Sequence, residues 1–202
     1  MTNLEQQLRN AAADPFLDRR RLASALAQRA FEARLLDVAY AVIDSPLGEL
    51  TVFVTPRGLL RVAYDNEQGD TVMKEVAEEV SPRILRAAKR TDEARRQIDG
   101  YFAGNRRRFD LPIDWSLVHG FAHGVLRATA GVPFGQTSTY GRMARAAGSP
   151  RAARAAGNAL GSNPIPIVVP CHRVLHSGGG LGGYGGGLEN KEYLLKLEGA
   201  RK

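Results

Sequence analysis

Short apolar runs alternate with turn sequences between residues 38 and 65, VAYAVIDSPLGELTVFVTPRGLLRVAYD. The three runs are rich in β-branched residues, and SPLG and TPRG separate them. Extended runs of this kind, bounded by proline and glycine, are typical of strands joined by tight turns. The pattern predicts an antiparallel meander.

Apolar positions at helical spacing flank this segment. Leu22, Leu26 and Ala30 recur within residues 17–36, which predicts an amphipathic helical extension. Residues 70–104 also have a helical composition, and the turn residues of 105–118 indicate a connector. This half of the chain contains no convincing catalytic constellation, so we expect its role to be structural.

The C-terminal half begins with an apolar segment that predicts a helix near residues 117–130. PFGQTSTYGRMARAAG then predicts a turn and another helix. Ser149-Pro150 is a strong helix start, because serine can cap free amides and proline suits the first helical position. Two short helices separated by a turn at Gly148 fit a helix-turn-helix motif.

The second of these helices, RAARAAGNALG, has one nearly smooth face. Its small residues recur at i, i+3, i+4 and i+7: Ala152, Ala155, Ala156 and Ala159. Arg151 and Arg154 are its only long side chains. Such a helix can press against a DNA groove while arginine reaches phosphates or enters the base stack. The alternative is an alanine-rich core helix with solvated arginines.

The only cysteine of the chain, Cys171, follows the apolar run IPIVV and Pro170. The run predicts a short buried strand that Pro170 ends. A lone cysteine is most often a small buried hydrophobe. His172 and Arg173 follow directly, however, and a neighbouring base or cation gives a thiol nucleophilic character. Both interpretations stay open.

A base next to Cys171 requires particular geometry. Adjacent residues of a strand face opposite sides, so either the chain bends after Pro170 or a water bridges Cys171 and His172. Glu192 and Glu198 on the predicted last helix are the acids best placed to orient the histidine, which would give a Cys-His-Glu relay. The glycine run 178–187 predicts a loop that approaches a planar ligand, with Tyr184 to stack on it, or a plain mobile loop.

Composition limits the class of protein. The chain has 202 residues, 44% hydrophobic and 24% charged, as in ordinary globular proteins. It has no apolar run of membrane-spanning length and no secretory signal, and one cysteine excludes an internal disulfide or a multi-thiolate zinc site. We therefore expect a soluble cytoplasmic protein without a membrane partner.

Charge distinguishes the two halves. Residues 1–114 carry equal numbers of acidic and basic side chains, so the formal net charge of +7 falls entirely within residues 115–202. A basic half suggests contact with a polyanion such as nucleic acid, and the alternative is a solvated basic surface.

PCHRV, preceded by NPIPIVV and followed by GGYGGGLENKEYLLKLEG, closely resembles the O6-alkylguanine-DNA alkyltransferases, the methylated-DNA–protein-cysteine methyltransferases. The resemblance covers about residues 38–200. It implies an α+β fold with a small ribonuclease H-like sheet and helix domain, followed by a helical domain with a helix-turn-helix motif. The resemblance implies a structural domain 37–112 and a DNA-binding, alkyl-accepting domain 116–202, and the expected division places the helical extension 1–36 before them.

The resemblance also implies roles for individual residues. Cys171 would accept the alkyl group, His172 would take the thiol proton through a water, and Glu198 would polarise His172. Asn163 would brace the turn, and Tyr140 would press on the phosphate and donate to the base. Arg154 would act as an arginine finger that fills the gap in the base stack, and the other implied DNA contacts are Arg151, Ala155 and Arg173. The residues implied to contact the flipped guanine are Val174, Tyr184 and Gly185.

The activity implied is direct repair of O6-alkylguanine, and of O4-alkylthymine, in double-stranded DNA bound through the minor groove. The base must be flipped, since a thiol cannot reach an O6 substituent within a duplex. The stable thioether makes the transfer stoichiometric. No metal, cofactor or obligate protein partner is implied, and the protein would act as a monomer.

Two other classes remain as alternatives. A cysteine hydrolase would release its product and turn over, whereas a damage-binding module would lack transfer, and the presence of Cys171 argues against it. The chain departs from the family pattern where Ala122 and Leu126 replace glutamine and tryptophan, and the extension 1–36 has no counterpart in the core family.

Overall fold

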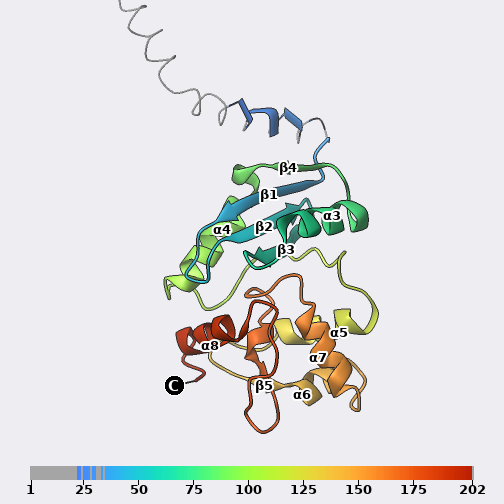
Figure 1. Ribbon diagram of the computed structural model, residues 1–202, viewed down its shortest axis with the longest axis vertical. Helices are drawn as coiled ribbons and strands as arrows, with labels where there is room; N and C mark the ends of the chain where they lie inside the picture. Colours follow the sequence, from blue (N-terminus) through green and yellow to red (C-terminus); the bar gives the residue numbers. More distant parts are fainter. Residues whose placement is uncertain (1–21, 24, 28, 31–32, 34, 202) are drawn as a thin grey trace, which may run out of the picture.

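The described chain contains a sheet with two helices and, below it in Figure 1, a second group of helices. The computed structural model describes residues 22–23, 25–27, 29–30, 33 and 35–201. Most of the predicted extension 1–36 lies outside the described residues, although Ala27 is buried in a small cluster with Ala39 and Ala87. No helix in the described part of the chain is long and apolar enough to cross a membrane.

The predicted meander is confirmed. Its strands are β1 (Val38–Ile43), β2 (Leu50–Thr55) and β3 (Gly58–Tyr64), and β2 pairs antiparallel with both neighbours. A short strand that the sequence analysis did not predict, β4 (Ile84–Arg86), pairs parallel to β1, which gives the order β3-β2-β1-β4. β4 has only three residues, too few to show a periodicity.

Helices cover both faces of this sheet. Successive side chains of a strand point to opposite faces. Phe53 and Leu60 therefore pack with α3 (Gly69–Glu79), whereas Val52 and Leu59 belong to the cluster that contains Ile98 of α4 (Ala88–Phe102). The face of the sheet that packs against α4 therefore also packs against the C-terminal half.

The helices of the C-terminal half are α5 (Gly120–Ala130), α6 (Tyr140–Ala146), α7 (Ala153–Gly161) and α8 (Leu188–Leu197). Of these, α6 and α7 form the predicted helix-turn-helix. The turn between α6 and α7 contains Gly148 at φ 82°, a conformation that favours glycine. α7 does not begin at Ser149-Pro150 as predicted, because these residues lie in the turn and the Ser149 carbonyl accepts a hydrogen bond from the Ala152 amide.

The segment 164–170 is buried as predicted, but it is not a strand. It forms consecutive turns, and Val168 and Val169 donate to the Pro166 and Ile165 carbonyls, each at 2.8 Å. Proline at 164 and 166 supplies no ladder donor, and Ile167 has φ 72°, which an extended chain does not allow.

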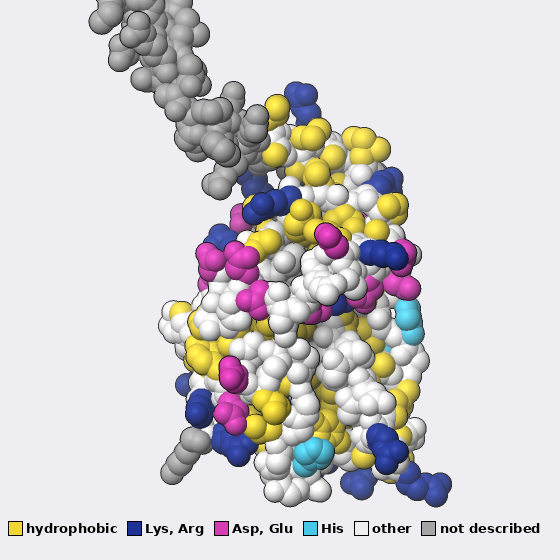
Figure 2. All heavy atoms as spheres, viewed as in Figure 1, with side chains coloured by type: hydrophobic (Ala, Val, Ile, Leu, Met, Phe, Trp, Pro, Cys, Tyr) yellow, Lys and Arg dark blue, Asp and Glu magenta, His cyan; other side chains and the backbone are white. Residues whose placement is uncertain are grey.

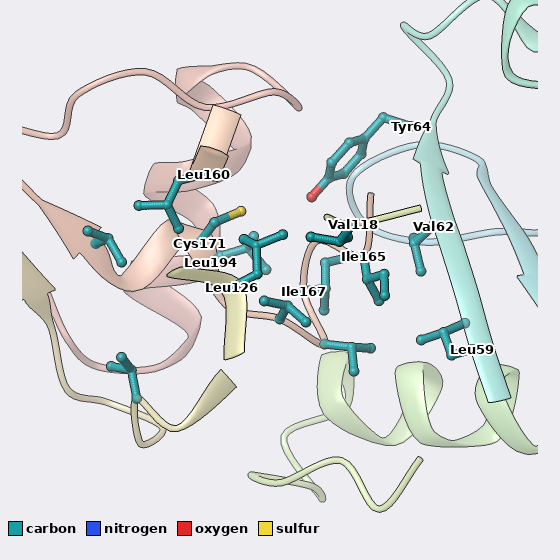
Figure 3. Packing of buried hydrophobic residues seen from close by; sticks show 14 of the residues in the cluster. Leu59, Val62, Tyr64, Val118, Leu126, Leu160, Ile165, Ile167, Cys171 and Leu194 are labelled. Atoms are coloured by element: carbon teal, nitrogen blue, oxygen red, sulfur yellow. The ribbon is translucent and has the colours of Figure 1, made fainter. Parts of the chain in front are cut away.

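One apolar cluster joins the two halves, as Figure 3 shows. Leu59 and Val62 of β3 pack in the same cluster as Ile165 and Ile167. The Val62 amide also donates to the Pro164 carbonyl at 2.8 Å. The α+β class is confirmed, while the boundaries 37–112 and 116–202 stay a prediction.

Candidate active site

Cys171 lies at a sharp bend between the buried turns and a short 3₁₀ helix, Cys171–Arg173. The chain thus bends after Pro170, which was one of the two expected geometries. Asn163 donates from Nδ2 to the Cys171 sulfur at 3.1 Å and to the Val169 carbonyl at 2.8 Å, and its Oδ1 accepts from the Ile165 amide. One amide side chain therefore fixes the turn and contacts the thiol.

The Cys171 thiol is neutral at rest. Burial raises its pKa to about 11, and the hydrogen bond from Asn163 and the charge of Lys191 only partly oppose this effect. A neutral thiol is a weak nucleophile, and the thiolate is the reactive form. The site therefore needs a base that acts when substrate is present.

Glu198, the residue directly after α8, is the centre of a buried hydrogen-bond network. Its carboxylate accepts from His172 Nε2 at 2.9 Å, from Arg173 at 2.8 and 2.9 Å, from the Tyr101 hydroxyl at 2.6 Å and from the Gly135 amide at 3.3 Å. Burial alone would raise the pKa of Glu198, but the hydrogen bonds from His172 and Arg173 outweigh it and lower the pKa to about 2.

The structure decides between the two candidate acids. Glu192 is exposed on α8, whereas Glu198 is buried against His172. Burial lowers the pKa of His172, and the hydrogen bond to Glu198 opposes this only in part, so the imidazole is neutral. Since the carboxylate accepts, Nε2 carries the hydrogen, and Nδ1 keeps a free lone pair. Nδ1 is buried and has no hydrogen-bond partner among the described residues, which leaves it available as a base.

Arg173 does not lie where the sequence analysis placed it. Its guanidinium is buried, pairs with Glu198 and donates to the Val132 carbonyl at 2.5 Å. The expected DNA contact by Arg173 is therefore wrong, because all of this side chain's described partners lie inside the protein.

The helix-turn-helix borders a cavity of about 660 Å³ whose lining includes Tyr140, Arg154 and Tyr184. Arg154 and Arg151 are exposed on α7 and at its start. Figure 2 shows Lys and Arg side chains at the lower right of the molecule, in the region of α6 and α7 in Figure 1. An exposed basic helix next to a cavity of this size can hold a polyanion and a planar group together.

The alanines of α7 fit both alternatives, a core helix and a helix that presses against DNA. Ala156 and Ala159 are buried in the core, whereas Ala155 is exposed beside Arg154. One side of the helix thus packs inside the protein and the other remains open to a partner.

The glycine loop packs closely against its neighbours. A Cβ on Gly182, which has φ 67°, would lie 2.2 Å from the Tyr140 hydroxyl. Val174 is buried and its carbonyl accepts a hydrogen bond from Lys191 at 2.9 Å, while Gly185 lines the cavity beside Tyr184.

Lys191 is a site residue that the sequence analysis missed. It is fully buried, and its ammonium group donates to the Val174 and Leu181 carbonyls, so it ties the glycine loop to the short strand that follows the thiol. Burial lowers its pKa to about 8. The available signal was a charged residue on the same helical face as the apolar Leu194.

Two tyrosines of the N-terminal half also reach the site. Tyr101 of α4 donates to Glu198, and the Tyr64 hydroxyl at the end of β3 lies 2.7 Å from the Tyr184 hydroxyl. The expectation that this half is only structural is therefore incomplete. No local pattern could have revealed these contacts, which join residues 97 and 120 positions apart.

Two family models match the chain. Residues 38–115 match the 6-O-methylguanine DNA methyltransferase ribonuclease-like domain, and residues 120–200 match the DNA binding domain of the same family. Methylated-DNA–protein-cysteine methyltransferases from Methanosarcina acetivorans and Mycolicibacterium paratuberculosis are 38% and 39% identical to the chain, each over 80% of it and over 98% and 92% of their own lengths.

Solved structures show the same similarity. The crystal structure of Mycobacterium tuberculosis O6-methylguanine methyltransferase has a TM-score of 0.67 and 37% identity, with 82% of this chain and 94% of that chain covered. Mycobacterium tuberculosis OGT in complex with DNA also has a TM-score of 0.67, with 36% identity over 80% of this chain and 93% of that chain.

Proposed function

The chain belongs to the methylated-DNA–protein-cysteine methyltransferase family, and on that premise we propose that it repairs O6-alkylguanine in double-stranded DNA by irreversible transfer of the alkyl group to Cys171. O4-alkylthymine is a second substrate of the same chemistry. The observation that carries the proposal is the buried Cys171 thiol directly before His172, whose Nε2 is hydrogen-bonded to the buried Glu198 carboxylate at 2.9 Å. We place the reaction in the cytoplasm, where a reducing environment keeps a single thiol reactive.

In the transfer step, the sulfur of Cys171 attacks the alkyl carbon, and the S–C bond forms as the C–O6 bond breaks. The thiol proton passes through a water to His172 Nδ1, the basic atom left free by the hydrogen bond to Glu198. Glu198, already ionised, stabilises the imidazolium that forms. The electron pair of the broken C–O6 bond stays on the guanine, which takes a proton from the Tyr140 hydroxyl. The proton that His172 accepted from the thiol returns through solvent to the Tyr140 phenolate, so no proton is gained or lost.

The high pKa of Cys171 fits a protein that reacts once. A thiol that stays protonated in the absence of substrate is protected from oxidants and stray electrophiles, since these react with the thiolate. The thioether product contains no bond that water cleaves readily, so each chain accepts one alkyl group.

The exposed arginines of α7 support binding of the lesion in duplex DNA. α7 lies in the minor groove with Ala155 toward the DNA, Arg151 contacts phosphate, and Arg154 fills the gap left by the flipped nucleotide. Tyr140 and Tyr184, which line the adjacent cavity with Arg154, then enclose the base.

The test of this function is incubation of the protein with a duplex that contains O6-methylguanine, followed by mass analysis of its peptides. We expect one methyl group, on the peptide that contains Cys171, and equimolar loss of the lesion. A cysteine hydrolase would instead consume many lesions per chain, and a binding module would leave both thiol and lesion unchanged; either result would overturn the proposal.

Arg154→Ala tests the finger. We expect transfer from duplex DNA to slow about 10- to 100-fold, because unstacking a base costs a few kcal/mol that the arginine no longer offsets. Transfer from a single-stranded oligonucleotide should remain at the wild-type rate, since no stack has to be opened. Rates are measured as lesion loss under protein excess.

Arg151→Ala is the matched control for this experiment, because Arg151 is an exposed arginine only three residues away. It should weaken binding to both kinds of DNA and reduce its salt dependence without a preference for duplex. Unchanged duplex transfer by Arg154→Ala would show that another residue opens the stack.

A further inference from the structure

Cys171 faces a second cavity, of about 350 Å³, between the two halves of the molecule. Its lining includes Cys171, Asn163 and Tyr184 from the C-terminal half and Arg61 and Tyr64 from β3. Figure 3 shows the Cys171 sulfur and the Tyr64 hydroxyl pointing toward the same space from opposite sides. The thiol therefore has a wall in front of it that the N-terminal half supplies.

This cavity adjoins the one beside the helix-turn-helix. Gly161, Tyr184 and Gly185 line both. A base that enters beside Arg154 and directs its O6 substituent at Cys171 points that substituent into the second cavity. The space between Cys171 and the N-terminal half is thus where the transferred group must fit.

Tyr64 is held rigidly at this position. Tyr64 is buried and lies opposite Leu50 in the pairing of β2 with β3, and its backbone amide donates to the Glu67 carboxylate at 2.9 Å. Its hydroxyl lies 2.7 Å from the Tyr184 hydroxyl, and its ring is pressed against the glycine loop, since a Cβ on Gly186 would lie 2.5 Å from it. A side chain anchored in this way forms a fixed boundary.

We propose that Tyr64 determines specificity, because its ring closes the cavity in front of Cys171 and limits the size of the O6 substituent that the thiol accepts. The inference rests on the proposed alkyl transfer. Tyr64 does not take part in the chemistry itself. The ring sets the limit, while the hydroxyl keeps the Tyr184 ring in place through their mutual hydrogen bond.

The experiment compares transfer of benzyl and methyl groups from duplexes that contain O6-benzylguanine or O6-methylguanine. The measured quantity is the ratio of the two second-order rate constants, which cancels changes in DNA binding, base flipping and active fraction. We expect Tyr64→Ala to raise the benzyl-to-methyl ratio at least about tenfold, the discrimination that a pocket gains from one or two carbon atoms. Tyr64→Phe, which keeps the ring, should leave the ratio near that of the wild type.

Two further variants keep the test decisive. Tyr64→Leu places a smaller apolar side chain at this buried position and should raise the ratio even if Tyr64→Ala does not fold. Tyr40→Ala removes a tyrosine of the same sheet that stacks on Phe53 away from the thiol, and it should not change the ratio.

The outcomes separate the two proposals. If the wild type transfers no methyl group, the proposed function fails. If methyl transfer persists and the ratio is the same in Tyr64→Leu, Tyr64→Ala and the wild type, Tyr64 is only a structural contact between the halves. A ratio raised equally by Tyr64→Phe would assign the limit to the hydrogen bond with Tyr184, which contradicts a limit set by the ring.

Discussion

Cys171→Ser abolishes alkyl transfer while binding to lesion-containing duplex DNA is retained. The expected loss of rate is on the order of 10⁶-fold, as for removal of a covalent nucleophile, and is effectively complete on the time scale of repair. A serine hydroxyl is far less acidic than a thiol, and its oxygen is a much weaker nucleophile toward the alkyl carbon than sulfur is, even with His172 as the base. The fold should persist, because the Asn163 amide that donates to sulfur at 3.1 Å can donate to the hydroxyl oxygen instead.

Transfer is measured by mass analysis of the peptides and binding by fluorescence anisotropy with a labelled O6-methylguanine duplex. Cys171→Ala is the control for the new hydroxyl, and it should also bind without reacting. Methylation of another residue in either variant, at a rate near that of the wild type, would show that Cys171 is not the acceptor.

Glu198→Gln should destabilise the fold and slow transfer together. The substitution preserves shape but leaves the buried Arg173 guanidinium without its counter-charge, and the new amide group cannot accept all the donors that surround it. Breaking a buried ion pair in this way costs about 3–5 kcal/mol, which lowers the melting temperature by about 6–20 °C in a chain of this size. Transfer slows because His172 loses the partner that fixes its tautomer.

Acid should remove the same stabilisation from the wild-type protein. The pKa of Glu198 is about 2 in the folded protein against an ordinary 4.5, so the unfolded chain takes up the proton first as the pH falls. The contribution of the ionised carboxylate is therefore complete above pH 4.5 and is lost as the pH falls toward 2. Urea unfolding at a series of pH values should show the difference between wild type and Glu198→Gln shrinking below pH 4.5.

Two control variants show whether the effect of Glu198→Gln is specific to this carboxylate. Glu192→Gln removes an exposed carboxylate from the same helix and should leave both stability and transfer unchanged. Glu198→Asp keeps the charge on a shorter side chain and should recover part of each. If Glu192→Gln lowered stability and transfer as much as Glu198→Gln, the proposal that Glu198 acts in a relay with His172 would be wrong.

The sequence alone determined the elements that turn residues separate. The apolar runs and turn sequences of residues 38–65 predicted β1, β2 and β3, and two helical segments around a turn at Gly148 predicted the helix-turn-helix, because proline and glycine mark where a regular element stops. The Cys171-His172 pair and its glycine-rich flank also indicated a candidate reacting centre, to which the family resemblance assigned roles.

Tertiary structure decided the features that depend on distant partners. The apolar run before Cys171 forms buried turns instead of the predicted strand. Its prolines and the positive φ of Ile167 do not suit a strand, and its side chains pack in the same cluster as those of β3. Tertiary structure also buried Arg173 against Glu198 rather than leaving it for DNA.

The same cause placed Tyr64 and Tyr101 at a site that belongs to the other half of the chain, and it chose Glu198 over Glu192. Local patterns report the burial of a segment, whereas the partner of a buried polar group depends on which distant segment folds against it. For this protein the sequence therefore pointed to Cys171 as the candidate nucleophile, and only the tertiary structure decided which residues surround its thiol and the neighbouring His172.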